Sequence, residues 1–136
     1  MVTPTTTRPT RSTGRWLVPV VADLGCVLAL AVGGKSSHDP GESAWVVLAI
    51  VWPFAVATVL AHGWLVLRGG RTRRVWPEGA VVLVATYVLG MLLRAASGRG
   101  TAPGFLVVAA VFLAVTMLGW RIAAGLVTHL RSTRAR

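Results

Sequence analysis

Asp23 is the residue whose type and position point most directly to chemistry, because it is the only formal charge in the apolar run 16–34. An acid near the middle of a membrane helix costs about 2.5 to 3.5 kcal/mol on insertion scales, so it usually faces protein or water. Two roles follow for Asp23. It can bind a proton or cation in a transport pathway, or it can be structural, either protonated or hydrogen-bonded to a neighbouring helix.

His62, Thr86 and Tyr87 fall at a similar depth in other apolar runs. At about 1.5 Å per residue, each lies on the order of 10 Å from the membrane face nearest to Asp23. Together with Asp23 they can form one polar layer. His62 is the only histidine inside an apolar run, which favours a packed histidine over paired histidine ligands for haem.

Arg121 would join this layer and pair with Asp23 if the last helix continued to Thr128. The alternative is that Trp120 and Arg121 mark the membrane interface, with the guanidinium group reaching into the headgroups. We favour the interface for Arg121. The intramembrane site predicted from the sequence therefore has Asp23 at its centre, with His62, Thr86, Tyr87 and Arg121 as candidate members.

Catalytic and metal-binding patterns are missing from the sequence. It contains no Gly-x-Ser-x-Gly, no P-loop and no His-Glu-x-x-His motif. Cys26 is the only cysteine, which excludes a disulfide framework and a cysteine-rich metal site. We predict that the chain is not an enzyme and that it holds no metal and no cofactor.

Four long apolar runs must position these residues. Of the 136 residues 54% are hydrophobic and 13% are charged, whereas soluble domains average about 25% charged. Expected spans are 16–34, 44–67, 77–97 and 102–127, each able to cross a bilayer as a helix. The sequence predicts an all-α, integral membrane four-helix bundle with up-down-up-down topology. Residues 1–15 are expected to be a disordered basic tail, and 131–136 a second basic tail.

The first span also resembles a cleavable signal peptide, since basic residues precede it and Ala29-Leu30-Ala31 lies near its end. Asp23 and Pro19 interrupt the apolar stretch, however, which favours a retained helix.

The basic residues predict the orientation. Eleven lie in the N-terminal tail, the second loop or the C-terminal end: Arg8, Arg11, Arg15, Arg68, Arg71, Arg73, Arg74, Arg121, Arg131, Arg134 and Arg136. Three lie in the other loops: Lys35, Arg94 and Arg99. The positive-inside rule then places both termini in the cytoplasm and the protein in the cell inner (cytoplasmic) membrane. The imbalance also argues against a dimer of oppositely inserted copies.

Arg68, Arg71, Arg73 and Arg74 form a basic cluster beside the membrane. Anionic headgroups attract such clusters by about 1 kcal/mol per residue. The expected partners are therefore a bilayer with anionic headgroups and, as a further option, a second copy or another membrane protein. Nucleic acid is not expected, because the basic residues form short clusters between apolar runs instead of one basic face.

Small motifs in residues 17–121 resemble the bacterial domain-of-unknown-function family 3054. The matching residues are Asp23, Gly34-Lys35-Ser36-Ser37-His38, Pro53-Phe54, Gly63-Trp64, Gly90-Met91-Leu92-Leu93-Arg94, Gly98 to Ala102 with Phe105, and Gly119-Trp120-Arg121. Lys35 stands where that family has arginine. The resemblance implies a small four-span membrane protein without an assigned activity.

The sequence thus favours a non-catalytic membrane protein with a structural or interaction role. The alternative is a small ion- or proton-coupled transporter that uses Asp23 in the first helix.

Overall fold

A computed structural model describes residues 14–36, 44–71 and 73–134, and these residues form helices and turns without a strand. The helices are α1 (Gly14–Ser36), α2 (Ala44–Leu67), α3 (Ala80–Ala96), α4 (Pro103–Leu113) and α5 (Gly119–Arg134). Two π-helical turns join them, η1 (Val75–Gly79) before α3 and η2 (Ala114–Leu118) between α4 and α5. Of the expected N-terminal tail, residues 1–13 lie outside the described part, and α1 already begins at Gly14.

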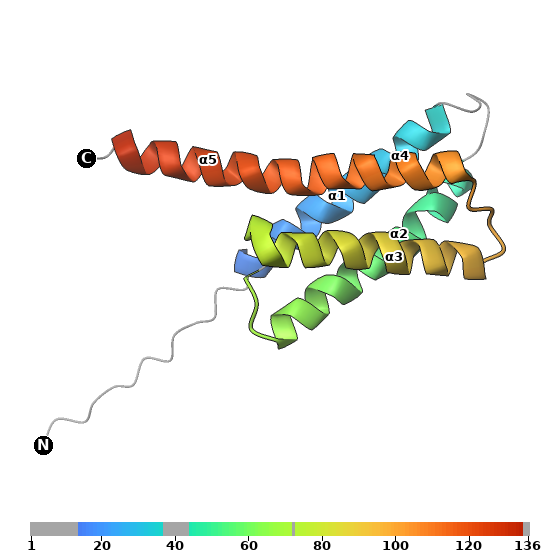
Figure 1. The fold of residues 1–136 in the computed structure, drawn as a ribbon, viewed down its shortest axis with the longest axis horizontal. Coiled ribbons are helices and arrows are strands. Elements are labelled where there is room, and N and C mark those ends of the chain that lie inside the picture. The colour runs from blue at the N-terminus through green and yellow to red at the C-terminus, as the bar shows by residue number, and fades with distance from the viewer. Residues whose placement is uncertain (1–13, 37–43, 72, 135–136) are drawn as a thin grey trace, which may run out of the picture.

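The four expected helices are confirmed. Helices long and apolar enough to cross a membrane cover 16–34, 45–67, 75–96 and 103–134. The last is longer than expected, because α4, η2 and α5 form one continuous helix to Arg134 (Figure 1). The residues from 131 onward, expected to be a tail, are therefore helical as far as Arg134.

Glycines end two of the helices. Gly69 and Gly98 have φ angles of 71° and 70°, a left-handed conformation that glycine adopts at little cost. After Gly69, the N–H of Gly70 donates to Leu65 O at 2.9 Å. Trp76 interrupts the start of the third span with an extended conformation (φ −130°, ψ 137°).

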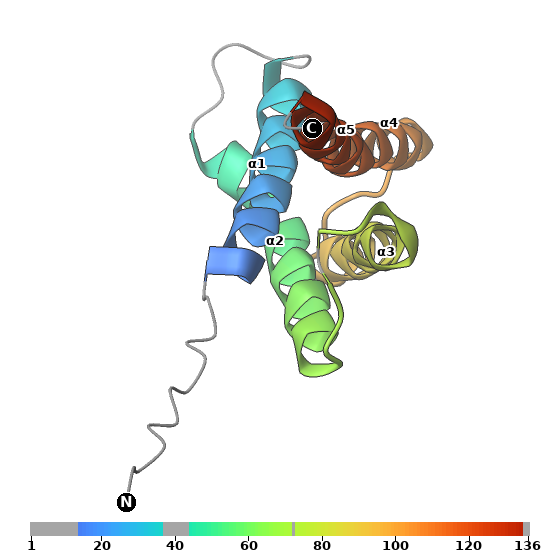
Figure 2. The ribbon, with the colours of Figure 1, turned by 90° about the vertical axis from the view of Figure 1, so that its left-hand side faces the viewer.

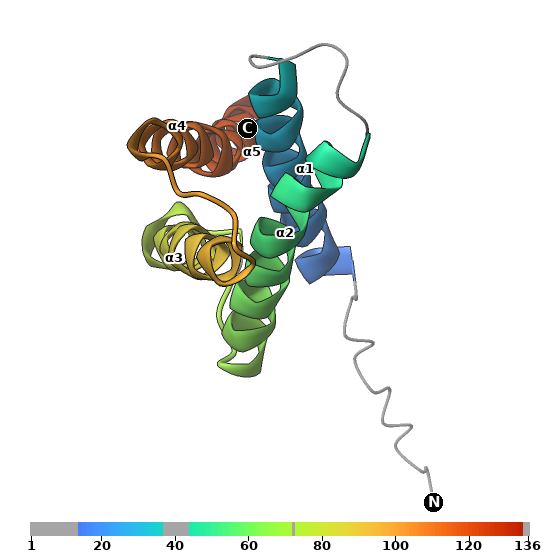
Figure 3. The same cartoon turned by 90° about the vertical axis from the view of Figure 1, so that its right-hand side faces the viewer.

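The helices close into a four-membered bundle. α2 packs against both α1 and α3, and the long α4–η2–α5 helix contacts α3 on one side and α1 on the other. Figures 2 and 3 show α3 and the long helix almost end-on, with α1 and α2 crossing beside them. This is the predicted all-α bundle, and its neighbours alternate in direction.

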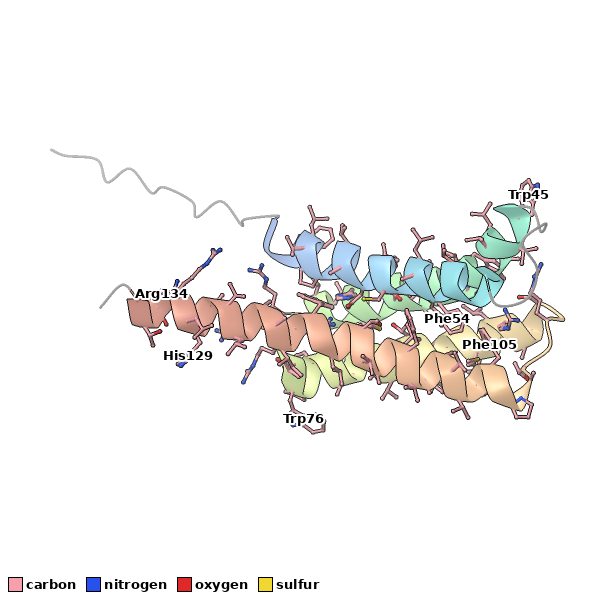
Figure 4. The ribbon with its side chains drawn as sticks, turned by 90° about the horizontal axis from the view of Figure 1, so that it is seen from above. Trp45, Phe54, Trp76, Phe105, His129 and Arg134 are labelled. Atoms are coloured by element: carbon pink, nitrogen blue, oxygen red, sulfur yellow. The ribbon has the colours of Figure 1, made fainter. Side chains whose placement is uncertain are left out.

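The core is apolar at one end of the bundle and polar toward the other. Phe54 is fully buried, and its ring centroid lies 6.3 Å from that of Phe105. Figure 4 shows the two residues near one another in the bundle. Gly90 of α3 lies so close to the Phe54 ring that any Cβ there would overlap it. α2 and α3 can therefore approach closely at this level.

The basic residues separate between the two ends of the bundle. The basic cluster follows α2, and Arg131 and Arg134 lie on the part of α5 that extends past the other helices (Figures 1 and 4). Arg94 and Arg99 lie where α3 ends, at the opposite end. Among the described residues, the basic cluster, Arg131 and Arg134 thus lie at one end of the bundle, and Arg94 and Arg99 lie at the other.

Candidate functional site

The polar centre of the bundle consists of three ionisable side chains from three helices. Asp23 on α1, His62 on α2 and Arg121 on α5 are 0%, 2% and 1% exposed. We call these three residues, together with Trp120, the ion cluster. Burying charges is unfavourable unless they are paired and hydrogen-bonded, so the contacts inside the cluster decide whether it can exist.

The carboxylate of Asp23 accepts four hydrogen bonds. Its Oδ1 accepts from Trp120 Nε1 and Arg121 Nη1, both at 2.8 Å. Its Oδ2 accepts from Arg121 Nη2 at 2.6 Å and from His62 Nε2 at 2.7 Å. A carboxylate has about four lone-pair positions, so its accepting capacity is used in full.

Arg121 is the main correction to the sequence interpretation. It does not reach the headgroups, because α5 continues to Arg134 and the guanidinium group turns inward to form a two-pronged ion pair with Asp23. Nη1 also donates to Met117 O, one turn earlier, at 2.7 Å. Paired guanidinium and carboxylate groups balance each other's charge and match in shape.

His62 contributes one ring nitrogen to the cluster. An ionised carboxylate can only accept hydrogen bonds, so Nε2 must carry a proton. The other nitrogen, Nδ1, is buried and has no hydrogen-bond partner within the described residues. His62 also borders an apolar groove of about 380 Å³ between α1 and α2, which Trp16 lines as well.

Trp120 is the member that sequence reasoning missed. The interface interpretation covers Trp120 as well as Arg121, but in the structure its indole N–H donates to Asp23 and its ring lies 4.6 Å from Arg121 Cζ. The ring thus stacks on the guanidinium group, a favourable cation–π contact. The spacing offered one signal: Trp120 and Arg121 are adjacent, so a helix that buries one places the other nearby.

Thr86 and Tyr87 do not join the ion cluster. Thr86 is fully buried, and its Oγ1 lies 3.2 Å from Oγ1 of Thr58, which itself donates to Phe54 O at 2.7 Å. Because the Thr58 hydroxyl has only one proton, Thr86 must be the donor between them. Tyr87 donates to Leu106 O at 3.1 Å and thereby links α3 to α4. The expected single polar layer is therefore not formed. In its place are three separate contacts: the ion cluster, the pair Thr58 and Thr86, and the hydrogen bond from Tyr87 to Leu106.

Gly79 makes room for Arg121. A Cβ at Gly79 would lie 3.0 Å from Arg121 Cδ and 2.8 Å from Arg74 O. The start of the third span therefore covers the stem of the arginine and keeps it away from solvent. Sequence reasoning did not identify this role, although Gly79 lies at the start of the predicted span 77–97.

The four arginines of the basic cluster, Arg68, Arg71, Arg73 and Arg74, are all exposed. Arg68 lies 4.7 Å above the Trp64 ring. Arg74 Nε is 3.9 Å from Glu78 Oε2, a weak surface pair. The cluster thus presents positive charge at one end of the bundle, as the headgroup hypothesis requires.

No three side chains of the types His, Cys, Asp and Glu come together as a possible metal site anywhere in 14–36, 44–71 or 73–134. The chemistry open to the ion cluster is limited, because its single carboxylate is buried and all of its hydrogen-bonding positions are filled. In this arrangement the carboxylate can fix three helices relative to one another.

Residues 20–124 match the family model described as "Protein of unknown function (DUF3054)". The match contains every member of the ion cluster and confirms the resemblance drawn from the small motifs. Comparisons with curated proteins and with solved structures give no significant match.

Proposed function

This chain belongs to the DUF3054 family, and we propose that it is a non-catalytic multi-pass membrane protein that works by binding lipid or another membrane protein. In this proposal the ion cluster is the structural centre of the bundle. We place the protein in the cytoplasmic membrane with both termini inside, because the basic end of the bundle should face the cytoplasm.

The observation that best supports the structural role is the complete burial of Asp23. Its carboxylate is 0% exposed and accepts from Arg121, His62 and Trp120 at 2.6 to 2.8 Å. A carrier that binds and releases a cation needs an acid that exchanges its partner. Here the permanent cation Arg121 already takes that place, which favours the structural role over ion-coupled transport.

The first experiment is a double-mutant cycle in purified protein, measured by thermal unfolding in detergent. Asp23→Asn leaves the Arg121 charge buried without its anion, and Arg121→Gln leaves the Asp23 charge without its cation. Breaking a buried pair costs about 3 to 5 kcal/mol, so each single variant should unfold at much lower temperature. The double variant should be less destabilised than the two single effects added together.

Transport is tested separately in proteoliposomes that enclose a pH-sensitive dye. The wild-type protein should produce no proton flux above that of protein-free vesicles under an imposed pH gradient. Flux in the wild type that vanishes in a folded Asp23→Asn variant would overturn the structural role. Infrared difference spectra give a second readout, since a carboxyl band that titrates and disappears in Asp23→Asn also contradicts the proposal.

A further inference from the structure

A cleft opens beside the ion cluster at the basic end of the bundle. It has a volume of about 470 Å³ and lies between residues 73–76, which precede α3, and the part of α5 from Trp120 to Thr128. Arg73 and Arg74 line one wall, and Arg121 borders the cleft from inside the bundle. Ala124 and Gly125 line the wall of α5 and leave space because their side chains are small.

The charges around the cleft nearly balance. Three guanidinium groups, of Arg73, Arg74 and Arg121, line the cleft. Two carboxylates lie next to them, Glu78 beside Arg74 and Asp23 beside Arg121. Arg121 is neutralised by Asp23, and Glu78 lies 3.9 Å from only one nitrogen of Arg74. One positive charge remains, carried by two exposed arginines. A phosphodiester carries one negative charge and accepts hydrogen bonds from guanidinium groups.

An apolar groove adjoins the cleft. It has a volume of about 640 Å³, follows η1 and α3 from Trp76 to Leu89, and its other lining residues are proline, alanine, valine and leucine. At about 1.5 Å per residue it is roughly 20 Å long, enough to cross one leaflet of about 15 Å. Trp76 borders both the cleft and the groove and projects from the bundle (Figure 4).

We propose that the cleft and the groove together bind one phospholipid whose headgroup carries a net negative charge. The phosphodiester binds between Arg73 and Arg74, the glycerol region lies against Trp76, and one acyl chain follows α3. A zwitterionic lipid fits less well, because its ammonium group would lie beside the same guanidinium groups. The proposal rests on the proposed function, since it names the lipid class that the protein binds.

The test measures how strongly the full-length protein prefers spin-labelled phosphatidylglycerol over spin-labelled phosphatidylcholine in bilayers, from the fraction of motionally restricted lipid. The variant Arg73→Gln/Arg74→Gln removes the two arginines of the cleft. The matched control Arg68→Gln/Arg71→Gln removes the same charge from the same loop, outside the cleft. Diffuse attraction to an anionic surface contributes roughly fivefold per arginine and is lost in both variants. The cleft variant also loses its hydrogen bonds to the phosphodiester, so its preference should fall about tenfold or more below that of the control.

Equal losses in the two variants would overturn the site, because they would mean diffuse attraction to the whole basic cluster.

The groove is tested by Val84→Trp, with Val111→Trp as control at a similarly exposed position on α4. Only Val84→Trp should reduce restricted lipid. If both variants leave the restricted lipid unchanged, the acyl groove is wrong. If inorganic phosphate or soluble glycerophosphate displaces the lipid completely, the site holds a free phosphate.

The outcome is independent of the ion cluster test. Every variant here retains Asp23 and should unfold close to the wild-type temperature, which confirms that the bundle is intact. A lipid preference that fails while the double-mutant cycle succeeds overturns the site and leaves the structural role of Asp23 in place.

Discussion

Trp120 Nε1 donates a hydrogen bond to Asp23 Oδ1 at 2.8 Å, on the same oxygen that accepts from Arg121. The substitution Trp120→Phe keeps an aromatic ring at this position and removes the donor, together with the five-membered part of the indole. A hydrogen bond to a charged group contributes about 1.5 to 3 kcal/mol, so we expect the unfolding temperature to fall clearly. Trp45→Phe, at an exposed position, is the control and should leave it unchanged. Equal stability of the two variants would show that the indole contact contributes nothing.

The contact of Gly90 with Phe54 predicts that α2 and α3 cannot separate to accept a side chain. Gly90→Ala should destabilise the protein by roughly 1 to 3 kcal/mol, the usual cost of overpacking. Phe54→Leu in the same chain should recover part of the loss, because it shortens the side chain that the new Cβ meets.

Gly63→Ala is the matched control for Gly90→Ala. A Cβ at Gly63 of α2 would meet nothing within 4 Å, and alanine favours helix more than glycine does. Its effect should be neutral or slightly stabilising. The close approach at Gly90 is wrong if both alanine variants behave alike in thermal unfolding.

The contact between Thr58 and Thr86 predicts unequal effects of two similar substitutions. Thr58→Val removes the acceptor and leaves the Thr86 hydroxyl without it, whereas Thr86→Val removes only the donor and leaves Thr58 bonded to Phe54 O. Hydrogen bonds between membrane helices average about 0.6 kcal/mol, so both losses should be small. Denaturant unfolding in mixed micelles should rank Thr58→Val below Thr86→Val, and the reverse order would contradict the assigned donor.

The charge asymmetry of the bundle predicts its orientation. In a Cys26→Ala background, a cysteine replacing Ser97 should react in intact cells with a maleimide that does not cross membranes. A cysteine replacing Ser132, on α5, should react only after the membrane is permeabilised. Labelling of both positions in intact cells would mean two orientations, and labelling of Ser132 alone would invert the topology that we propose.

The sequence predicted the spans because their signal is local: each run is apolar and long enough for a bilayer. It also predicted Asp23 and His62, since polar groups inside such runs stand out in composition. Thr58 was not predicted as a buried polar residue, although its spacing could have identified it. It lies four residues after Phe54 and four before His62, on the buried face of α2.

The pairing of Asp23 with Arg121 could not be settled from the sequence because it depends on where the last helix ends. With a helix that ends near 127, Arg121 lies close to the interface and both interpretations are open. Since the helix runs to Arg134, Arg121 lies more than three turns from its end and packs under Gly79. Thr86 and Tyr87 had the correct depth, but the rotation of α3 about its axis directs them to Thr58 and Leu106.

The continuous last helix, α4–η2–α5, has a fixed length along the bundle. Its 32 residues measure about 48 Å, whereas the hydrocarbon core is about 30 Å thick. Even with a tilt of about 20°, some 15 Å of helix must stand clear of the hydrocarbon. A rigid helix cannot shorten when a bilayer thickens. Because the ion cluster holds α5 against α1, the distance by which Arg134 projects from the membrane should decrease as the bilayer becomes thicker.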